Sequence, residues 1–261
     1  MNRLMNSNAW RSFALPAGSI AVVLISMGIV IAEQPADPKI VPAVESSDAA
    51  VRQYGVAVAF QNRRVFDLAA DEWRSFLEKH ADDPLAAKAE YYLGVCHFQL
   101  KKYPEAQSAF EAVVAKHPDF ELLESTYLNL ALTQYNQGQE NLELFDAAAT
   151  TFGKLVEKFP KGEHAPTALY YRAESHYARG RRDEAIADYR RLLADFPKSP
   201  LRAKTLYGLG VALEENKAPG EAGTIYDTFL KEFPKDALAT EVGMRRGETL
   251  IAQGQPAEAA K

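Results

Sequence analysis

The pattern of apolar and polar positions repeats every 37 residues along the chain, with one longer interval of 42. One position of each unit is always glycine or alanine, and we call it the small rung. The small rungs are Ala57, Gly94, Ala131, Ala173, Gly210 and Gly247. Repetition at such a period indicates a stacked array of short structural units. The five extra residues of the third unit follow Gly138, which predicts a loop insertion there.

Each of the six units also contains an alanine, which in the first five is followed by large apolar residues at offsets of four, seven and eight. These offsets place all four positions on one stripe of a helix. The alanines are Ala69, Ala106, Ala148, Ala185, Ala222 and Ala259. The residues at offset four are Trp73, Phe110, Phe152, Tyr189 and Tyr226, and those at offset seven are Phe76, Val113, Leu155, Leu192 and Phe229. Each unit is therefore predicted to hold two helices, the first with the small rung and the second with this stripe.

Prolines mark the helix boundaries. The second helix is predicted to end at His117-Pro118, Phe159-Pro160, Phe196-Pro197 and Phe233-Pro234, because proline disfavours the helical conformation of the preceding residue. Asp83-Pro84 and Ser199-Pro200 predict helix starts, with an N-cap followed by a first-turn proline.

The segment "YYLGVCHFQLKKYPEAQSAFEAVVAKHP", Tyr91 to Pro118, resembles the tetratricopeptide repeat, a helix pair with Leu-Gly in its first helix and alanine with an aromatic in its second. The resemblance covers roughly residues 50–261. The "FPKSP"-type linkers look like those of a bacterial envelope subgroup, which includes the Tol-Pal cell-division coordinator and the outer-membrane assembly lipoprotein.

We therefore expect an all-α fold, a right-handed solenoid of about five and a half helix pairs over residues 49–261. The sixth unit begins its second helix near Pro256 and lacks the residues that would complete it. We expect the natural protein to continue beyond Lys261.

In the family the first helices line a concave groove, with the residues three before, one after and four after the small rung pointing toward it. The resemblance therefore implies an aromatic and aliphatic groove that turns acidic toward the C-terminus. Two alternatives remain for its tyrosines, namely capture of a peptide and packing between neighbouring first helices. The candidate groove residues are Tyr54, Tyr91, Phe98, Tyr135, Tyr170, Tyr177 and Tyr207.

The N-terminal segment differs from the repeats. Residues 17–32 form an uncharged run that ends in Val30-Ile31-Ala32, so residues 1–32 are predicted to be a secretory signal peptide. The alternative is an uncleaved single-span membrane anchor. Residues 33–48 contain three prolines and predict a flexible linker. We thus expect an exported protein in the periplasm or cell envelope, in contact with a membrane only through that segment.

Charge, composition and motifs exclude several classes of function. The net charge of −5 argues against nucleic acid binding, which needs a basic face. The five histidines show no metal-ligand spacing, and neither a nucleophile elbow nor a glycine-rich phosphate loop occurs. The charged turn "RGRRDE", Arg179 to Glu184, is expected to be solvated. We therefore predict no enzyme activity, metal or cofactor, and a scaffold that binds proteins or peptides. The alternatives are a structural component of an envelope complex or an accessory repeat domain of a larger protein.

Overall fold

The computed structural model describes residues 46–259, which form twelve helices and no strands. The predicted signal or anchor segment, residues 1–32, and the linker as far as residue 45 lie outside the described residues. The helices are α1 (Asp48–Asn62), α2 (Phe66–Lys79), α3 (Ala86–Gln99), α4 (Tyr103–Lys116), α5 (Leu123–Gln137), α6 (Glu143–Lys158), α7 (Ala165–Ala178), α8 (Arg182–Asp195), α9 (Arg202–Glu215), α10 (Pro219–Glu232), α11 (Ala239–Ala252) and α12 (Pro256–Ala259).

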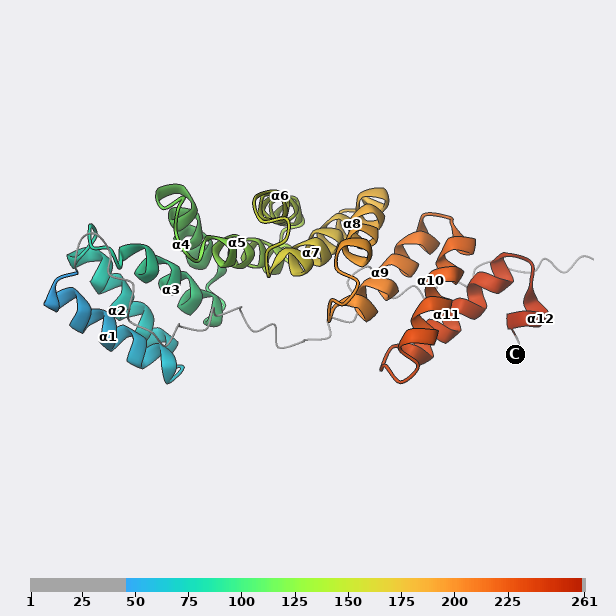
Figure 1. The fold of residues 1–261 in the computed structure, drawn as a ribbon, viewed down its shortest axis with the longest axis horizontal. Coiled ribbons are helices and arrows are strands. Elements are labelled where there is room, and N and C mark those ends of the chain that lie inside the picture. The colour runs from blue at the N-terminus through green and yellow to red at the C-terminus, as the bar shows by residue number, and fades with distance from the viewer. Residues whose placement is uncertain (1–45, 260–261) are drawn as a thin grey trace, which may run out of the picture.

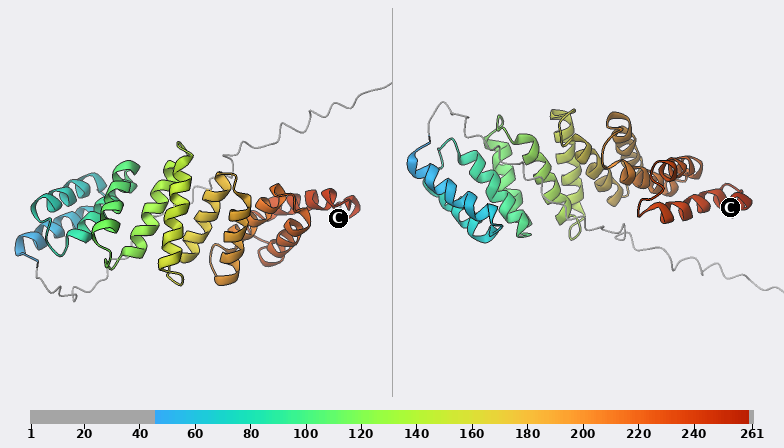
Figure 2. Two further views of the ribbon diagram at one scale, coloured as in Figure 1. Left: turned by 90° about the horizontal axis from the view of Figure 1, so that it is seen from above. Right: turned by 60° about the horizontal axis from the view of Figure 1, so that its bottom comes forward.

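The helices stack along one long axis in chain order, each packed against the next (Figures 1 and 2). The odd-numbered helices are the first helices of the repeats, and α4, α6 and α8 lie along one side of α5 and α7 (Figure 1). The first helices also contact one another from repeat to repeat, in the pairs α3–α5, α5–α7 and α7–α9. Elements on the inside of a curved stack lie closer together, so we take the first helices as the inner face. The predicted all-α solenoid is confirmed.

The core consists of the positions that the periodicity predicts. The side chains at offsets four and seven of the second-helix stripe are buried in all five complete repeats, beginning with Trp73 and Phe76. The small rungs provide room for these rings. A Cβ atom added to Gly94 would lie 2.7 Å from the ring of Phe110, and one on Gly210 would lie 2.2 Å from that of Tyr226. A larger residue at these rungs would therefore have to push the two helices of its repeat apart.

The turn inside most repeats contains one residue in the left-handed region. These residues are Arg64, Lys101, Gly180, Lys217 and Gly254, with φ between 58° and 75°. The residue that follows each of them donates its N–H to a carbonyl of the first helix, as Lys102 does to His97 over 2.8 Å. This arrangement is the Schellman ending of a helix, which satisfies carbonyls that the last turn leaves free.

The third repeat departs from this turn, as the five extra residues predict. Its α5 has 15 residues where α3 has 14, and α6 has 16 where α4 has 14. Its turn spans 138–142, whereas the corresponding turn of the second repeat spans 100–102. The insertion is therefore shared between the loop and the two helices rather than confined to the loop.

The helix ends are predicted correctly and two of the starts are not. His117, Phe159, Phe196 and Phe233 are the C-cap residues of their helices. Pro84 and Pro200, in contrast, lie in the turns before α3 and α9. Asp83 Oδ1 accepts from the backbone N–H of Leu85 over 2.9 Å, and Ser199 Oγ does the same for Leu201 over 3.2 Å. These side chains stabilise the turn between repeats instead of capping the helix, because they bond two residues ahead and the helix starts later.

Candidate functional site

All seven candidate groove residues lie on first helices, but they differ in exposure. Tyr91 and Phe98 on α3 are buried. The other five, Tyr54, Tyr135, Tyr170, Tyr177 and Tyr207, are half-buried. The structure therefore gives α3 a packing role at two of the candidate positions, since a buried side chain offers a partner no surface.

The N-terminal part of the inner face is held by aromatic packing. Tyr54 meets the ring of Trp73 edge to face, with ring centroids 4.8 Å apart, and Trp73 stacks on Tyr92 at 5.6 Å. The indole N–H of Trp73 donates to Gln61 over 3.0 Å. Burial raises the pKa of Tyr54, so its hydroxyl stays neutral. This region offers ring edges and aliphatic side chains without a formal charge at the groove positions.

The middle of the inner face is a cluster of tyrosines from two repeats. Tyr135 on α5 meets Tyr171 on α7 edge to face with centroids 5.2 Å apart, and Tyr171 meets Tyr170 at 5.1 Å. Burial raises the pKa of both Tyr135 and Tyr170. Such edge-to-face pairs stabilise the contact between first helices beyond simple burial.

Glu174 lies beside this cluster and is only 7% exposed. Its carboxyl accepts a hydrogen bond from the hydroxyl of Tyr189, and Tyr170 hydrogen-bonds to it as well. Burial raises the pKa of Glu174, although these hydrogen bonds and the positive charge of Lys204 act in the opposite direction. No ion pair to Glu174 occurs within residues 46–259.

The first of two tyrosine–arginine pairs lies at the edge of α7. The guanidinium of Arg182 lies over the ring of Tyr177, 3.9 Å from its centroid. Glu215 joins both residues, since it accepts from the Tyr177 hydroxyl over 2.5 Å and pairs with Arg182 Nε over 2.5 Å. The group ties the fourth repeat to α9 of the fifth.

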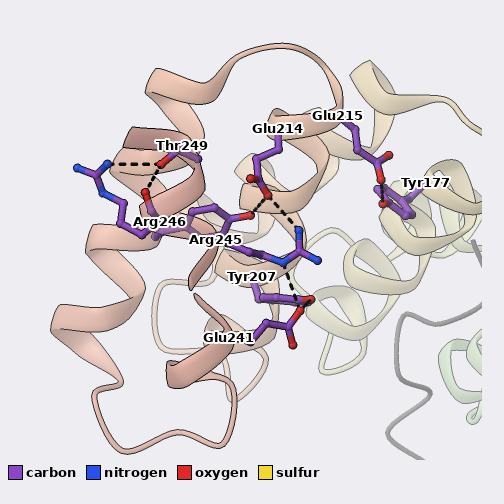
Figure 3. A network of polar contacts seen from close by, with 9 residues as sticks. Tyr177, Tyr207, Glu214, Glu215, Glu241, Arg245, Arg246 and Thr249 are labelled. Atoms are coloured by element: carbon purple, nitrogen blue, oxygen red, sulfur yellow. Dashed lines mark hydrogen bonds and ion pairs between the residues drawn. The ribbon is translucent and has the colours of Figure 1, made fainter. Parts of the chain in front are cut away.

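The second pair lies between α9 and α11 (Figure 3). Arg245 on α11 extends toward α9, with its guanidinium 5.7 Å from the ring centroid of Tyr207. Its Nη1 lies 3.2 Å from Glu214 Oε2 and its Nε lies 3.2 Å from Glu241 Oε1. Tyr207 donates to Glu241 over 2.6 Å, and burial together with that bond raises the pKa of Tyr207 to about 12. The C-terminal part of the inner face is therefore built from tyrosines, carboxylates and arginines.

The arginines of this network are the residues that sequence reasoning missed. The turn "RGRRDE" was expected to be solvated, yet Arg179 and Arg181 both pair with Asp146 of the preceding repeat, and Arg182 pairs with Glu215 of the following one. Their side chains remain partly exposed, so the turn is both solvated and tied to its neighbours. The position of Arg245, two before a small rung, carried no signal because that position varies between repeats.

The histidines do not form a metal site. No group of three or more histidine, cysteine, aspartate or glutamate side chains in the described part of the chain could hold a metal ion. His164 is buried, with its Nε2 3.0 Å from the hydroxyl of Ser125, so it joins two repeats. His176 lies 3.8 Å from Asp188, and its pKa is lowered by burial. Among the helices from α1 to α12, none is long and apolar enough to cross a membrane.

Solved structures share this fold. A tetratricopeptide repeat protein from Parabacteroides merdae ATCC 43184 is 17% identical with a TM-score of 0.63, and the match covers 82% of this chain and 77% of that one. MamA from Desulfovibrio magneticus RS-1 is 14% identical with a TM-score of 0.60, over 74% of this chain and 99% of that one. YrrB, described as a tetratricopeptide repeat protein with an unusual peptide-binding site, is 20% identical with a TM-score of 0.58, over 74% and 90%. At these identities the likeness shows the fold alone.

The sequence itself identifies the family. No match is found among curated proteins. The tetratricopeptide repeat model, however, matches residues 56–120, 128–200 and 172–237, which together cover more than half of the chain. Repeats of this family typically form non-catalytic scaffolds that bind proteins. With its 37-residue units, its small rungs and its inner row of first helices, the chain belongs to the tetratricopeptide repeat family.

Proposed function

We propose that the protein is an exported scaffold that binds peptide segments or partner proteins on the inner face of its helical array. The observation that carries this proposal is the set of half-buried tyrosines on α1, α5, α7 and α9, which lie on the first-helix side of the stack and are interrupted only at α3. Tyrosine provides a large contact area at a low cost in conformational entropy, and suits the capture of extended peptides. YrrB, which shares the fold, is described as having a peptide-binding site.

The proposed export rests on the sequence alone, namely on residues 1–32 and on the linkers between repeats. An uncharged run ending in small residues is typical of a secretory signal, and the bacterial envelope subgroup shares the linker pattern. In the cell we expect the repeats in the periplasm or cell envelope. The alternative is that the same segment stays as a single-span anchor.

The experiment that tests the scaffold function is photo-crosslinking in the native cell. A photoreactive phenylalanine analogue replaces Tyr177 on the inner face in one variant and Leu68, an exposed residue of the second helix α2, in another. We expect covalent adducts to a partner from the Tyr177 position and none above background from the Leu68 position. Adducts that form only from Leu68 would contradict binding on the inner face.

A second candidate function, a structural component of an envelope assembly, is favoured by α11. Met244 and Ile251 on this helix are 62% and 60% exposed, the highest values among the large apolar side chains of residues 46–259. A neighbouring subunit or domain that stacked on α11 would bury them. Crosslinks to a partner from Met244 and Ile251, with none from Tyr54, Tyr135 or Tyr177, would favour this candidate over the scaffold, which predicts crosslinks along the whole inner face.

A further inference from the structure

The fourth and fifth repeats contain the same group of side chains with one member missing. In the fifth repeat, the core tyrosine Tyr226 donates a hydrogen bond to Glu214 over 2.5 Å, and Glu214 pairs with Arg245. The guanidinium of Arg245 also lies over Tyr207. A tyrosine from the second helix, a carboxylate and a tyrosine from the first helix thus surround one arginine.

The fourth repeat contains three of these four side chains, namely two tyrosines and a glutamate. Tyr189 lies 37 residues before Tyr226 and donates to Glu174. Tyr170 lies 37 residues before Tyr207 and hydrogen-bonds to the same carboxyl. Both tyrosines therefore keep their places around an inner-face glutamate, although this glutamate comes from another position of the first helix.

The fourth part, the arginine, is replaced by a glycine. Position 208 lies 37 residues before Arg245 and is Gly208, which has no side chain to offer. A Cβ there would lie 2.8 Å from the hydroxyl oxygen of Tyr189, so Tyr189 uses the room beside α9 to reach Glu174. Within residues 46–259, no arginine or lysine lies over the ring of Tyr170 and none forms an ion pair with Glu174.

We propose that Tyr170, Glu174 and Tyr189 form a subsite for an arginine side chain of the bound partner, which supplies the guanidinium that this repeat lacks. The inference rests on the proposed scaffold function and names the partner's chemistry, a basic segment bound along the inner face. Charge complementarity supports this occupant. At the candidate groove positions of all six repeats no basic residue occurs, and the acidic ones are Glu174, Glu214 and Glu248.

The chemistry of the subsite suits a guanidinium. Tyr170 is half-buried, so a planar cation can stack on the exposed part of its ring, and Glu174, which hydrogen-bonds to Tyr170, supplies the opposite charge. Burial raises the pKa of Glu174, and Lys204 is the one cation that acts against this shift. The groups that face it are Tyr135 from α5, Tyr170 and Tyr171 from α7, Tyr189 from α8 and Lys204 from α9. Lys204 is the single cation among them, and it would compete with the partner's arginine.

The test uses the full chain and two short Gly-Ser peptides that differ in one residue. One peptide carries a central arginine and the other a citrulline, which has the same shape without the charge. Binding is read from the aromatic NMR signals of labelled tyrosines. We expect the arginine peptide to bind about tenfold more tightly than the citrulline peptide, the difference that a partly desolvated cation–aromatic contact gives. Equal affinities would overturn the inference.

Two variants test whether the preference for the arginine peptide comes from this subsite. Glu174→Gln removes the charge but keeps an oxygen that accepts from Tyr189, and should abolish the preference for arginine. Glu78→Gln, an exposed residue of the second helix α2, changes the net charge equally and should leave the preference intact. A preference that survives Glu174→Gln, or one that both variants abolish, contradicts the proposed subsite.

A third variant keeps the test decisive if Glu174→Gln does not fold. Lys204→Met removes the competing cation from a half-exposed position on α9 and should raise the affinity for the arginine peptide several-fold. An unchanged or lower affinity overturns the inference. The scaffold function is judged separately by the crosslinks from Tyr177, so a partner captured there without any arginine preference would refute the subsite alone.

Discussion

The second and fifth repeats have the same backbone plan and different inner faces. On α3 the residues that surround the small rung Gly94 are Tyr91, Val95 and Phe98, and all three are buried in aromatic and aliphatic packing. On α9 the equivalent residues are Tyr207, Val211 and Glu214, and two of them join an arginine network with α11. The positions that hold the helices together are kept, whereas the positions that face inward change their chemistry from repeat to repeat.

This contrast separates two roles within one array. The N-terminal half, from α1 to α6, is held by rings such as Trp73 and Phe110, and its inner face carries no formal charge at the groove positions. The C-terminal half, from α7 to α11, adds carboxylates and arginines that link successive repeats. A partner that binds along the whole inner face would therefore meet an apolar part followed by an acidic part.

The largest effect is expected from the core of the N-terminal half. Trp73→Ala should lower the free energy of unfolding by about 3–5 kcal/mol, because it empties a fully buried site that contacts Tyr54, Tyr92 and Gln61. Chemical denaturation followed by circular dichroism measures the loss. Leu68→Ala on the same helix is the control and should change stability by less than about 0.5 kcal/mol, since Leu68 is exposed. Similar losses for both variants would contradict this account of the core.

The small rungs give the next effect. Gly94→Leu should destabilise the protein by about 1–3 kcal/mol, because the new side chain meets the ring of Phe110. The matched control is Gly55→Ala, where an added Cβ meets nothing within 4 Å in a helix, and which should raise stability by up to about 1 kcal/mol. An unchanged melting temperature for Gly94→Leu would refute the role of the rungs.

The networks of the C-terminal half should be weaker and sensitive to salt. Arg245→Ala leaves the partly buried Glu214 and Glu241 without their cation, and should cost about 1–2 kcal/mol at low salt. Part of that loss should disappear at high ionic strength, which screens such pairs. Arg74→Ala breaks an exposed pair with Asp71 and should cost less than about 0.5 kcal/mol. Equal costs for the two variants would mean that the inner network adds no stability.

A small pH effect should come from Glu174. Its pKa in the folded state is raised above the ordinary value of 4.5, so the folded protein holds this proton more tightly than the unfolded chain does. Stability should therefore fall as the pH rises from about 4.5 to the folded pKa, and stay level above it. Glu174→Gln should lack this fall. Parallel curves of unfolding free energy against pH for the two proteins would show that Glu174 ionises freely in the folded state.

Much of the fold could be predicted because packing depends on side-chain size and period. The rungs occur at the same offset in all six units, the second-helix stripe in five of them, and four second helices end at a residue followed by proline. The left-handed turn residues could not be read in the same way, because Arg64, Lys101 and Lys217 stand where glycine would be expected. Their conformation follows from the hydrogen bonds that close the turn.

The candidate site was harder to predict for a related reason. Position within a repeat indicates which way a residue points but not what the next repeat places against it. Tyr91 and Tyr207 share a position, yet Asn129 donates to the hydroxyl of Tyr91 in a buried contact, whereas Tyr207 donates to Glu241 in a partly open one. Pairs such as Arg245 and Glu214 join residues 31 apart in the sequence, and one sequence alone gives no sign of such pairing.

The central claim is that the inner face, and above all its C-terminal half, is the surface that meets a partner. Hydrogen–deuterium exchange of the full chain, alone and with the partner recovered by crosslinking, tests it most directly. The account predicts the strongest protection in α7, α9 and α11, weaker protection in α1 and α3, and little change in the second helices α4, α6 and α8. Protection concentrated in those second helices, with the first helices unchanged, would contradict it.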